Sequence, residues 1–393
     1  MAVKFTKPEI NVREKLAELD KPSGIAGEAM LRAETPQEQQ ALIGVGRRNI
    51  LINGAMQIAQ RATSATGITT AGYKALDRWE PNVATAGTWT LSQETDTPSG
   101  FGNSAKMLCT TADTSLATTH NVYFNQRVEG YNLQAFAKGT SDAKSLTMSF
   151  WVKSNVTGLY TAEIYDNDND RMCGQNYTIN SSGTWEYKTV TFPPDGTGTW
   201  NNDNNLSAFI AFWLAGGPSF NTGSGVGNWQ SGNANRCPGQ VNLAGAVNNY
   251  WQITGVQLEV GKIATPFEHR SYGEELALCQ RYCYVIGNHS VSTSDLFAVG
   301  TGNGTGTSTT FHLHPVEMRA KPSLSYSALA DFVCYNFATS TTLSAPTAIN
   351  LITSIATQRW SYIDFTNSGT TTGSAIMLRA ANTSTKLIFS AEL

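Results

Sequence analysis

Charge is scarce in this sequence and nearly balanced. Lys, Arg, Asp and Glu make up 15% of its 393 residues, and the formal net charge is −3 at pH 7. Sequence-independent binding to nucleic acid or to an anionic membrane needs an excess of positive charge, so we expect no nucleic-acid partner. No apolar run comes close to the ~20 residues of a spanning helix, so we expect no membrane insertion.

An export signal and paired cysteines are also lacking. The first residues, MAVKFTKP, contain no apolar core of the kind found in signal peptides, so we expect the chain to fold in the cytoplasm where it is made. The six cysteines show no paired-ligand spacing, and we expect them to be reduced and buried.

Sequence signatures of catalysis are missing as well. There is no Gly-x-Ser-x-Gly elbow, and the Gly-rich stretch at 300–308 is not followed by the Lys-Ser/Thr of a phosphate loop. We therefore expect no enzyme. A carboxylate pair suited to glycoside hydrolysis is recognised only in three dimensions, so that alternative stays open.

The charged residues are concentrated at the N-terminus. Residues 1–48 contain eight basic and seven acidic residues. Capping-box spacings beginning at Thr6 and Thr35 predict short helices near 8–20 and 36–43. Their apolar residues are too few to form a core alone, so this segment needs a host surface or sister copies to order it. A frayed tail is the alternative.

From residue 49 onward, runs alternate between apolar and polar residues and are bounded by Gly, Asn, Asp or Pro. This is the pattern of β-strands, and no helical period competes with it. The sequence therefore predicts a mainly β fold. We divide it into a helical N-terminal segment, a jelly-roll β-sandwich, a helical connector and a smaller C-terminal β-domain: 1–48, 49–270, 271–287 and 288–393.

The junction between the two β-domains changes period in mid-course. Residues 255–283 read GVQLEVGKIATPFEHRSYGEELALCQRYC, in which a strand, with a bulge at Gly255, gives way to a helix capped by Ser271 and Glu274. Five residues of the connector have heptad spacing, which suggests parallel chains that meet about an axis: Tyr272, Leu276, Cys279, Cys283 and Ile286. Packing of this stripe on its own jelly roll is the alternative.

Two groups of residues could bind a metal ion. Asp166, Asp168 and Asp170 alternate after a strand, so their oxygens could converge on Ca²⁺, although a hairpin turn explains them equally well. His312 and His314 share one face of a strand; we favour an outward-facing pair over a metal site.

Two polar insertions, at 195–206 and 216–247, combine indole rings with amide and carboxylate groups. Sugars need this mixture, because their C–H faces stack on rings while their hydroxyls need donors and acceptors. The candidate glycan-binding residues are Trp200, Asn202, Asp203, Trp229 and Gln230. In the alternative interpretation both tryptophans close the edge of the sandwich.

Three stretches carry a resemblance to a known group of proteins: residues 255–283, NILINGAMQIAQR at 49–61, and FHLHPVEMRAK at 311–321. Together they resemble the non-catalytic fibre and tail-associated proteins of marine and cyanobacterial bacteriophages, whose central domain is similar to the jelly rolls of carbohydrate-binding modules. The resemblance covers roughly residues 1–320.

This resemblance implies a homotrimeric virion fibre protein that folds in the host cytoplasm. Residues 1–48 would attach it to another virion protein, in the tail, and the β-domains would recognise a host-surface glycan or outer-membrane component. A capsid decoration or head fibre without a glycan is the alternative. A polysaccharide depolymerase is disfavoured, because the sequence has no repeat of 20 to 50 residues.

Overall fold

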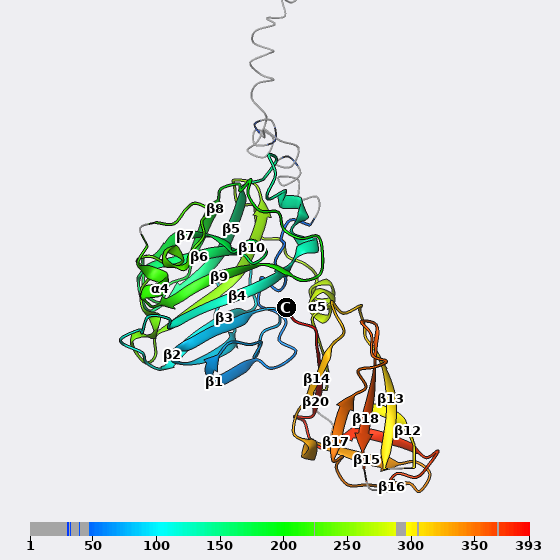
Figure 1. The fold of residues 1–393 in the computed structure, drawn as a ribbon. Coiled ribbons are helices and arrows are strands. Elements are labelled where there is room, and N and C mark those ends of the chain that lie inside the picture. Colours follow the sequence, from blue (N-terminus) through cyan, green and yellow to red (C-terminus); the bar gives the residue numbers. More distant parts are fainter. Residues whose placement is uncertain are drawn as a thin grey trace, which may run out of the picture.

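The computed structural model describes residues 47–223, 225–287, 296–304, 306–367 and 369–393, together with Met30, Arg32 and Gln39. It is mainly β, as the sequence predicts, and consists of two β-units that follow one another along the chain (Figure 1). Apart from Gln39, the helices predicted at 8–20 and 36–43 lie outside the described residues. None of the described helices is long and apolar enough to cross a membrane.

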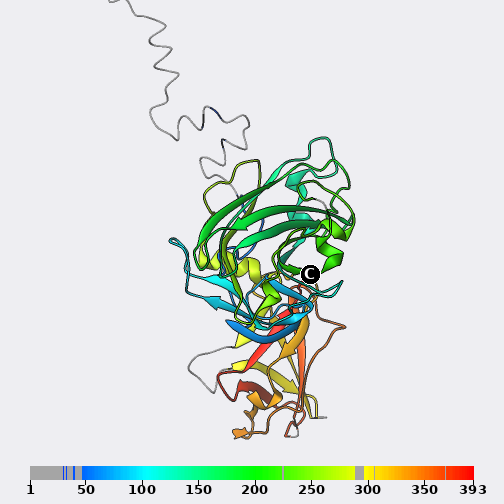
Figure 2. The ribbon, with the colours of Figure 1, turned by 90° about the vertical axis from the view of Figure 1, so that its left-hand side faces the viewer.

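The first unit is built on a single antiparallel sheet with the strand order β7-β6-β9-β4-β2-β3-β10-β5-β8, and β1 pairs with β2. The sheet curls over so that its two ends, β7 and β8, lie side by side, which produces a sandwich (Figure 2). Its strands are β1 (Ser64–Thr70), β2 (Glu80–Glu94), β3 (Ser104–Thr111), β4 (Asn121–Glu129), β5 (Leu146–Ser154), β6 (Gly158–Asp166), β7 (Arg171–Ile179), β8 (Glu186–Phe192), β9 (Leu206–Gly216) and β10 (Tyr250–Val260).

Short helical turns lie in the loops of this unit. They are η1 (Gly130–Asn132), η2 (Gln134–Phe136), α4 (Pro218–Asn221), η3 (Asn233–Asn235) and η4 (Leu243–Gly245). The last three belong to the predicted loop at 216–247, which therefore folds back on the sheet as a structured insertion.

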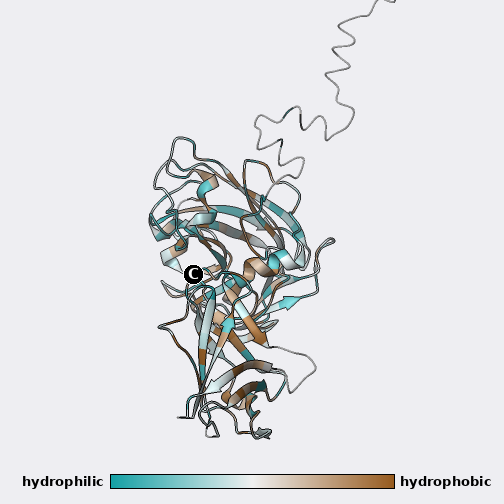
Figure 3. Ribbon diagram, turned by 90° about the vertical axis from the view of Figure 1, so that its right-hand side faces the viewer, coloured by the Kyte–Doolittle hydropathy of each residue, from teal (hydrophilic) through white to brown (hydrophobic). Residues whose placement is uncertain are grey.

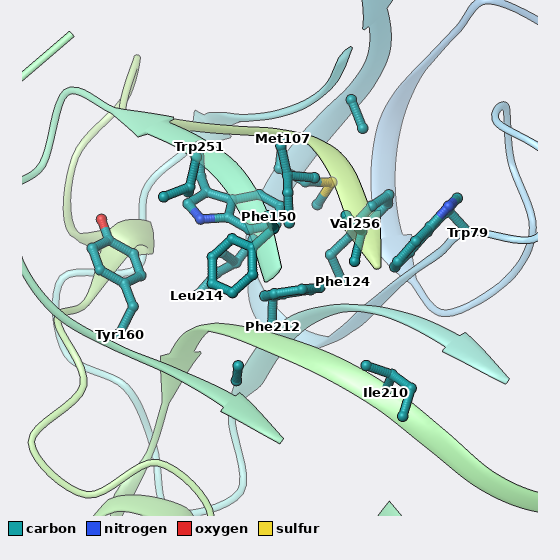
Figure 4. Packing of buried hydrophobic residues seen from close by; sticks show 14 of the residues in the cluster. Trp79, Met107, Phe124, Phe150, Tyr160, Ile210, Phe212, Leu214, Trp251 and Val256 are labelled. Atoms are coloured by element: carbon teal, nitrogen blue, oxygen red, sulfur yellow. The ribbon is translucent and has the colours of Figure 1, made fainter. Parts of the chain in front are cut away.

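Aromatic side chains fill the interior of the first unit (Figure 4). Trp79 stacks on Phe124 with ring centroids 5.2 Å apart, and the Phe212 ring contacts both Phe150 and Trp251. All five are fully buried. Burying an aromatic side chain of this size stabilises the fold by about 1.5–3 kcal/mol, so this cluster makes a large contribution to the core.

The bulge predicted at Gly255 is confirmed. The pairing of β10 with β5 shifts register between Thr254 and Gln257. Gly255 has φ 62°, and a Cβ at this position would lie 2.6 Å from the Phe101 ring. Both the left-handed conformation and the close approach therefore require glycine.

The junction helix α5 (Tyr272–Gln280) begins with the predicted capping box between Ser271 and Glu274. It is shorter than predicted, because the chain returns to a strand, β11 (Cys283–Gly287).

The predicted heptad seam is therefore wrong, since a seam requires one continuous helix. Cys283 and Ile286 lie on β11, and Tyr272 on the helix is 63% exposed. Cys279, on the same helix as Leu276, is buried in a cluster with Ile52, Ile58 and Tyr282, so the helix packs on its own jelly roll.

The second unit is a sandwich of a three-stranded sheet, order β11-β20-β14, and a seven-stranded sheet, order β16-β15-β19-β12-β13-β18-β17. It includes β11, which the sequence assigned to the connector. The other elements are β12 (Leu296–Gly302), β13 (Thr307–Leu313), β14 (Ser323–Tyr326), η5 (Leu329–Asp331), β15 (Phe332–Asn336), β16 (Thr341–Thr342), β17 (Ala348–Leu351), β18 (Trp360–Thr366), β19 (Ala375–Ala380) and β20 (Lys386–Ser390).

The core of the second unit contains two histidines that the sequence placed outside. His312 and His314 are 8% and 4% exposed, and both rings pack against Phe389. The strand alternates as expected, but the apolar residues Phe311 and Leu313 take the outward positions. The prediction of an outward-facing histidine pair is therefore wrong.

The C-terminal residues return to the first unit. Glu392 forms ion pairs with Arg78 and Arg61, both buried in the first unit. Arg319 donates to the carbonyls of Asn204 and Glu392 at 2.8 and 2.9 Å. These contacts fasten the two units together at the junction.

Candidate functional site

The two tryptophans predicted to bind a glycan close the edge of the sandwich instead. Trp200 is 6% exposed, and its ring contacts Phe136 and Trp229 edge to face. The Lys138 ammonium lies 5.4 and 5.0 Å from the Trp200 and Trp229 ring centroids, a cation–π arrangement. Only 6% of Trp200 reaches solvent, so its ring is not accessible to a sugar.

The polar residues predicted beside these rings hold their own loops. The Asp203 carboxylate accepts from the backbone and side-chain amides of Asn205. Gln230 forms a β-bridge with Met172, and Asn202 is exposed on the loop before β9. The structure does not bring these residues into one binding surface.

The predicted calcium ligands also have separate partners. Asp166 is fully buried and pairs with the Lys138 ammonium at 2.5 Å. Asp168 accepts from the backbone N–H of Asn201, and Asp170 accepts from the hydroxyl of Tyr165. Among the described residues, no group of three His, Cys, Asp or Glu side chains is placed to hold a metal ion.

A different group of aromatic residues lies on the face of the first sheet that points away from the core. On β9, Ile210, Phe212 and Leu214 belong to the core. Phe209 and Trp213 occupy the alternate positions of the strand and therefore point to the opposite face. Tyr123 on β4 and Tyr165 on β6 point the same way, because β9 pairs with both strands.

The rings of these residues form a continuous row. Phe209 stacks on Tyr123, with centroids 6.0 Å apart, and on Tyr165, with centroids 4.7 Å apart. Tyr123 also contacts Trp213 at 5.1 Å. Trp213 is buried, whereas Tyr123, Tyr165 and Phe209 are half-buried and reach solvent.

A buried ion pair supports the row. The guanidinium of Arg236 donates to both oxygens of Glu163 at 2.8 and 2.7 Å, and Glu163 also accepts from the indole N–H of Trp213. The same guanidinium lies 4.7 Å from the centre of the Tyr165 ring and 5.8 Å from that of Tyr123. The insertion at 216–247 supplies this arginine and so holds the rings in place.

Burial keeps the two tyrosines neutral. It raises the pKa of Tyr123 to about 12, and with the neighbouring Asp170 it raises the pKa of Tyr165 to about 12. Both phenols therefore stay protonated at neutral pH.

Amide side chains border the aromatic row. Asn82 pairs in register with Tyr123, and Asn121 and Asn125 point from the same side of β4. Asn125 donates to the Glu80 carbonyl, whereas the buried Oδ1 of Asn121 accepts no hydrogen bond. We call Tyr123, Tyr165 and Phe209, with these three asparagines, the aromatic face.

Arginines pair with the carboxylates beside this surface. Its two buried carboxylates, Glu163 and Glu80, are ion-paired with Arg236 and Arg127. Burial raises the pKa of Glu80 despite the nearby Arg127 guanidinium, because desolvation disfavours the charged carboxylate.

A separate pocket lies at the junction of the two units, lined by residues that include Arg270, Arg281 and Glu268. Arg270 pairs with Glu268 and Glu275, and Arg281 pairs with Glu129. Two of the arginines at this pocket are thus paired within the chain.

The aromatic face was not predicted from the sequence. Its three strands were predicted, and the aromatic residues at their outward positions were a signal that could have indicated a binding surface. The pairing of β4, β9 and β6 was not visible, because residues 130–205 separate β4 from β9 in the sequence.

No protein-family model matches this sequence, and no curated protein matches it. Solved structures do show similarity. They include the enzymatically active domain of tailspike protein 4 of bacteriophage CBA120, with 12% identity and a TM-score of 0.30, where the match covers 54% of this chain and 21% of that one.

Others are a putative sugar binding protein from Bacteroides thetaiotaomicron, with 11% identity and a TM-score of 0.31, and a family 11 carbohydrate-binding module of a Clostridium thermocellum cellulase, with 12% identity and a TM-score of 0.26. These matches cover 55% and 53% of this chain, and 100% and 98% of those chains.

Proposed function

We propose that this chain recognises glycans through the aromatic face. The observation that carries the proposal is the row of half-buried rings Tyr123, Phe209 and Tyr165 bordered by asparagine amides. Aromatic rings contact the C–H faces of a sugar, and amides satisfy its hydroxyls as donors and acceptors.

Preorganisation favours binding at this face. The rings stack on one another and on the Arg236–Glu163 pair, so they lose little conformational freedom when a ligand binds. Asn82, which pairs with Tyr123 and is half-buried, offers its amide to a hydroxyl of the ligand.

We place this activity in a bacteriophage virion fibre. The sequence resemblance at 49–61, 255–283 and 311–321 supports this placement. In this proposal residues 1–48 attach the chain to the tail, and the β-units project towards a glycan of the host surface. Several copies of the chain associate; the fibres that the sequence resembles contain three. The chain binds and does not cleave.

The proposal is tested by the affinity of the full chain for polysaccharides of candidate hosts. Tyr165→Leu removes a ring from the row but keeps an apolar side chain. Since an aromatic contact contributes about 0.5–1.5 kcal/mol, we expect affinity to fall by roughly 2- to 10-fold.

Tyr187→Leu is the matched control, because Tyr187 is 46% exposed on β8, away from this face. We expect it to bind like the parent. Equal affinity of the parent and Tyr165→Leu, or a loss confined to Tyr187→Leu, would refute the assignment to the aromatic face. Release of reducing ends from the polysaccharide would contradict the non-enzymatic role.

A further inference from the structure

The seven-stranded sheet of the second unit has one face in the core and one face that nothing in the described chain covers. On β18, Ser361, Ile363 and Phe365 are buried, and the residues between them point outward. The apolar segments of this unit are brown in Figure 3.

The outward positions carry large apolar side chains. Phe311 is 50% exposed, Leu313 63%, Trp360 39% and Val299 48%. Six of the twelve exposed large hydrophobic residues in the described chain belong to the second unit. Soluble proteins rarely leave such residues grouped on one surface unless it is an interaction site.

Strand pairing places these residues side by side. Phe311 is opposite Tyr362, and Leu313 is opposite Trp360. On the other side of β12, Val299 is opposite Met377. We call these outward residues of β12, β13, β18 and β19 the outer face.

The outward positions of the seven strands contain two charges of opposite sign, Arg379 on β19 and Asp364 on β18. Neither has an ion-pair partner among the described residues. Arg379 lies over the Tyr335 ring, and Asp364 accepts from the hydroxyl of Thr309.

The two charges lie on opposite sides of the central apolar row. Arg379 is two residues beyond Met377 along β19, towards the end of the sheet where Leu313 lies on β13. Asp364 is two residues beyond Tyr362, opposite Thr309 and thus on the other side. A surface with this layout is complementary to itself, because a second copy can place its acidic end on the basic end of the first.

We propose that a second copy of this chain covers the outer face, with Arg379 facing the partner's Asp364. The aliphatic side chains of Val299, Leu313 and Met377 favour a protein over a sugar, which needs more hydrogen-bonding groups. The surface belongs to the other β-unit and does not depend on glycan binding. It supplies the contact between copies that the connector helix does not.

The test is the mass of the full chain by sedimentation equilibrium over a range of concentrations. We expect a mass of two chains for the parent, because a face that is complementary to itself closes with two copies. Arg379→Glu and Asp364→Arg should each raise the dissociation constant at least tenfold, because like charges then face each other. The double variant R379E/D364R should restore association, since the swapped charges attract again.

Leu313→Thr tests the apolar part of the contact. Leu313 is 63% exposed, so its loss should weaken association at least tenfold with little change in melting temperature. Lys144→Glu, an exposed site of the first unit, is the charge control and should leave the mass unchanged.

A mass of one chain for the parent at all concentrations would overturn the proposal. So would a charge-swapped double variant that associates no better than the single variants. Loss of glycan binding on mutation of the outer face of a monomeric parent would assign that face to the glycan instead. Failure of Tyr165→Leu to alter glycan binding bears on the aromatic face alone.

Discussion

Acid should destabilise the second unit through its two buried histidines. Desolvation, together with the neighbouring His314, lowers the pKa of His312 from about 6.5 to about 4, and desolvation lowers the pKa of His314 to about 4. Their surroundings are apolar or neutral: both rings pack on Phe389, His314 on Tyr284, and His314 also hydrogen-bonds Ser361.

The sign and size of the effect follow from these pKa values. Between pH 6.5 and 4 the unfolded chain binds protons at both histidines while the folded unit does not, so stability falls as the pH falls. The stability contributed by the neutral histidines is fully present above the pKa of the unfolded chain, near 6.5. It stops falling once the pH is below the pKa of the folded unit, near 4. A difference near 2.5 units corresponds to about 3 kcal/mol per histidine, a large fraction of a domain's 5–15 kcal/mol.

Hydrogen exchange resolved by peptide, measured from pH 7.5 to 4.5, separates the two units. After correction for intrinsic exchange, we expect protection of β13, β18 and β20 to fall with pH while β9 and β10 change little. The variant His312→Gln/His314→Gln lacks both buried histidines, so the slope in the second unit should flatten. An equal slope in parent and variant would refute this reasoning.

Three further outcomes are expected. Arg236→Met should destabilise the first unit by about 3–5 kcal/mol in chemical denaturation, because Glu163 is left charged and buried; adding Glu163→Gln should recover part of the loss, and no recovery would count against the ion pair. Chelator should leave the melting temperature unchanged, since the carboxylates of Asp166–Asp170 have protein partners, and a drop would revive the calcium site. Glu392→Gln should lower the melting temperature, because buried Arg78 then loses its anionic partner; an unchanged value would mean that this contact does not hold the units together.

Local features of the fold were readable from the sequence. The strands were visible in the period-two alternation, the start of α5 in the Ser271–Glu274 capping box, and the bulge in the slip at Gly255. Each depends on residues close in sequence, so no knowledge of the tertiary structure was needed.

The helical connector shows where local reasoning fails. The heptad spacing that begins at Tyr272 continues by coincidence past the end of α5 to Cys283 and Ile286, which lie on β11. The chain leaves the helix to pair β11 with β20, from Cys283 opposite Ser390 to Gly287 opposite Lys386, and that distant partner is not visible locally.

The candidate site failed for a similar reason. The residues around Trp200 had a composition suited to sugars, but Lys138 and Phe136 cover its ring from another part of the chain. Conversely, Tyr123, Phe209 and Tyr165 come together only when β4, β9 and β6 pair. Residue type suggested the chemistry, whereas strand pairing determined where it could occur.

The most direct test of the proposed function is a structure of the full chain with a bound oligosaccharide from a host-surface polysaccharide that it binds. We predict a sugar ring in van der Waals contact with Tyr165 or Phe209 and a hydroxyl hydrogen-bonded to the side-chain amide of Asn82. A sugar bound only at the outer face of the second unit, or at the loop around Trp229, would contradict the account.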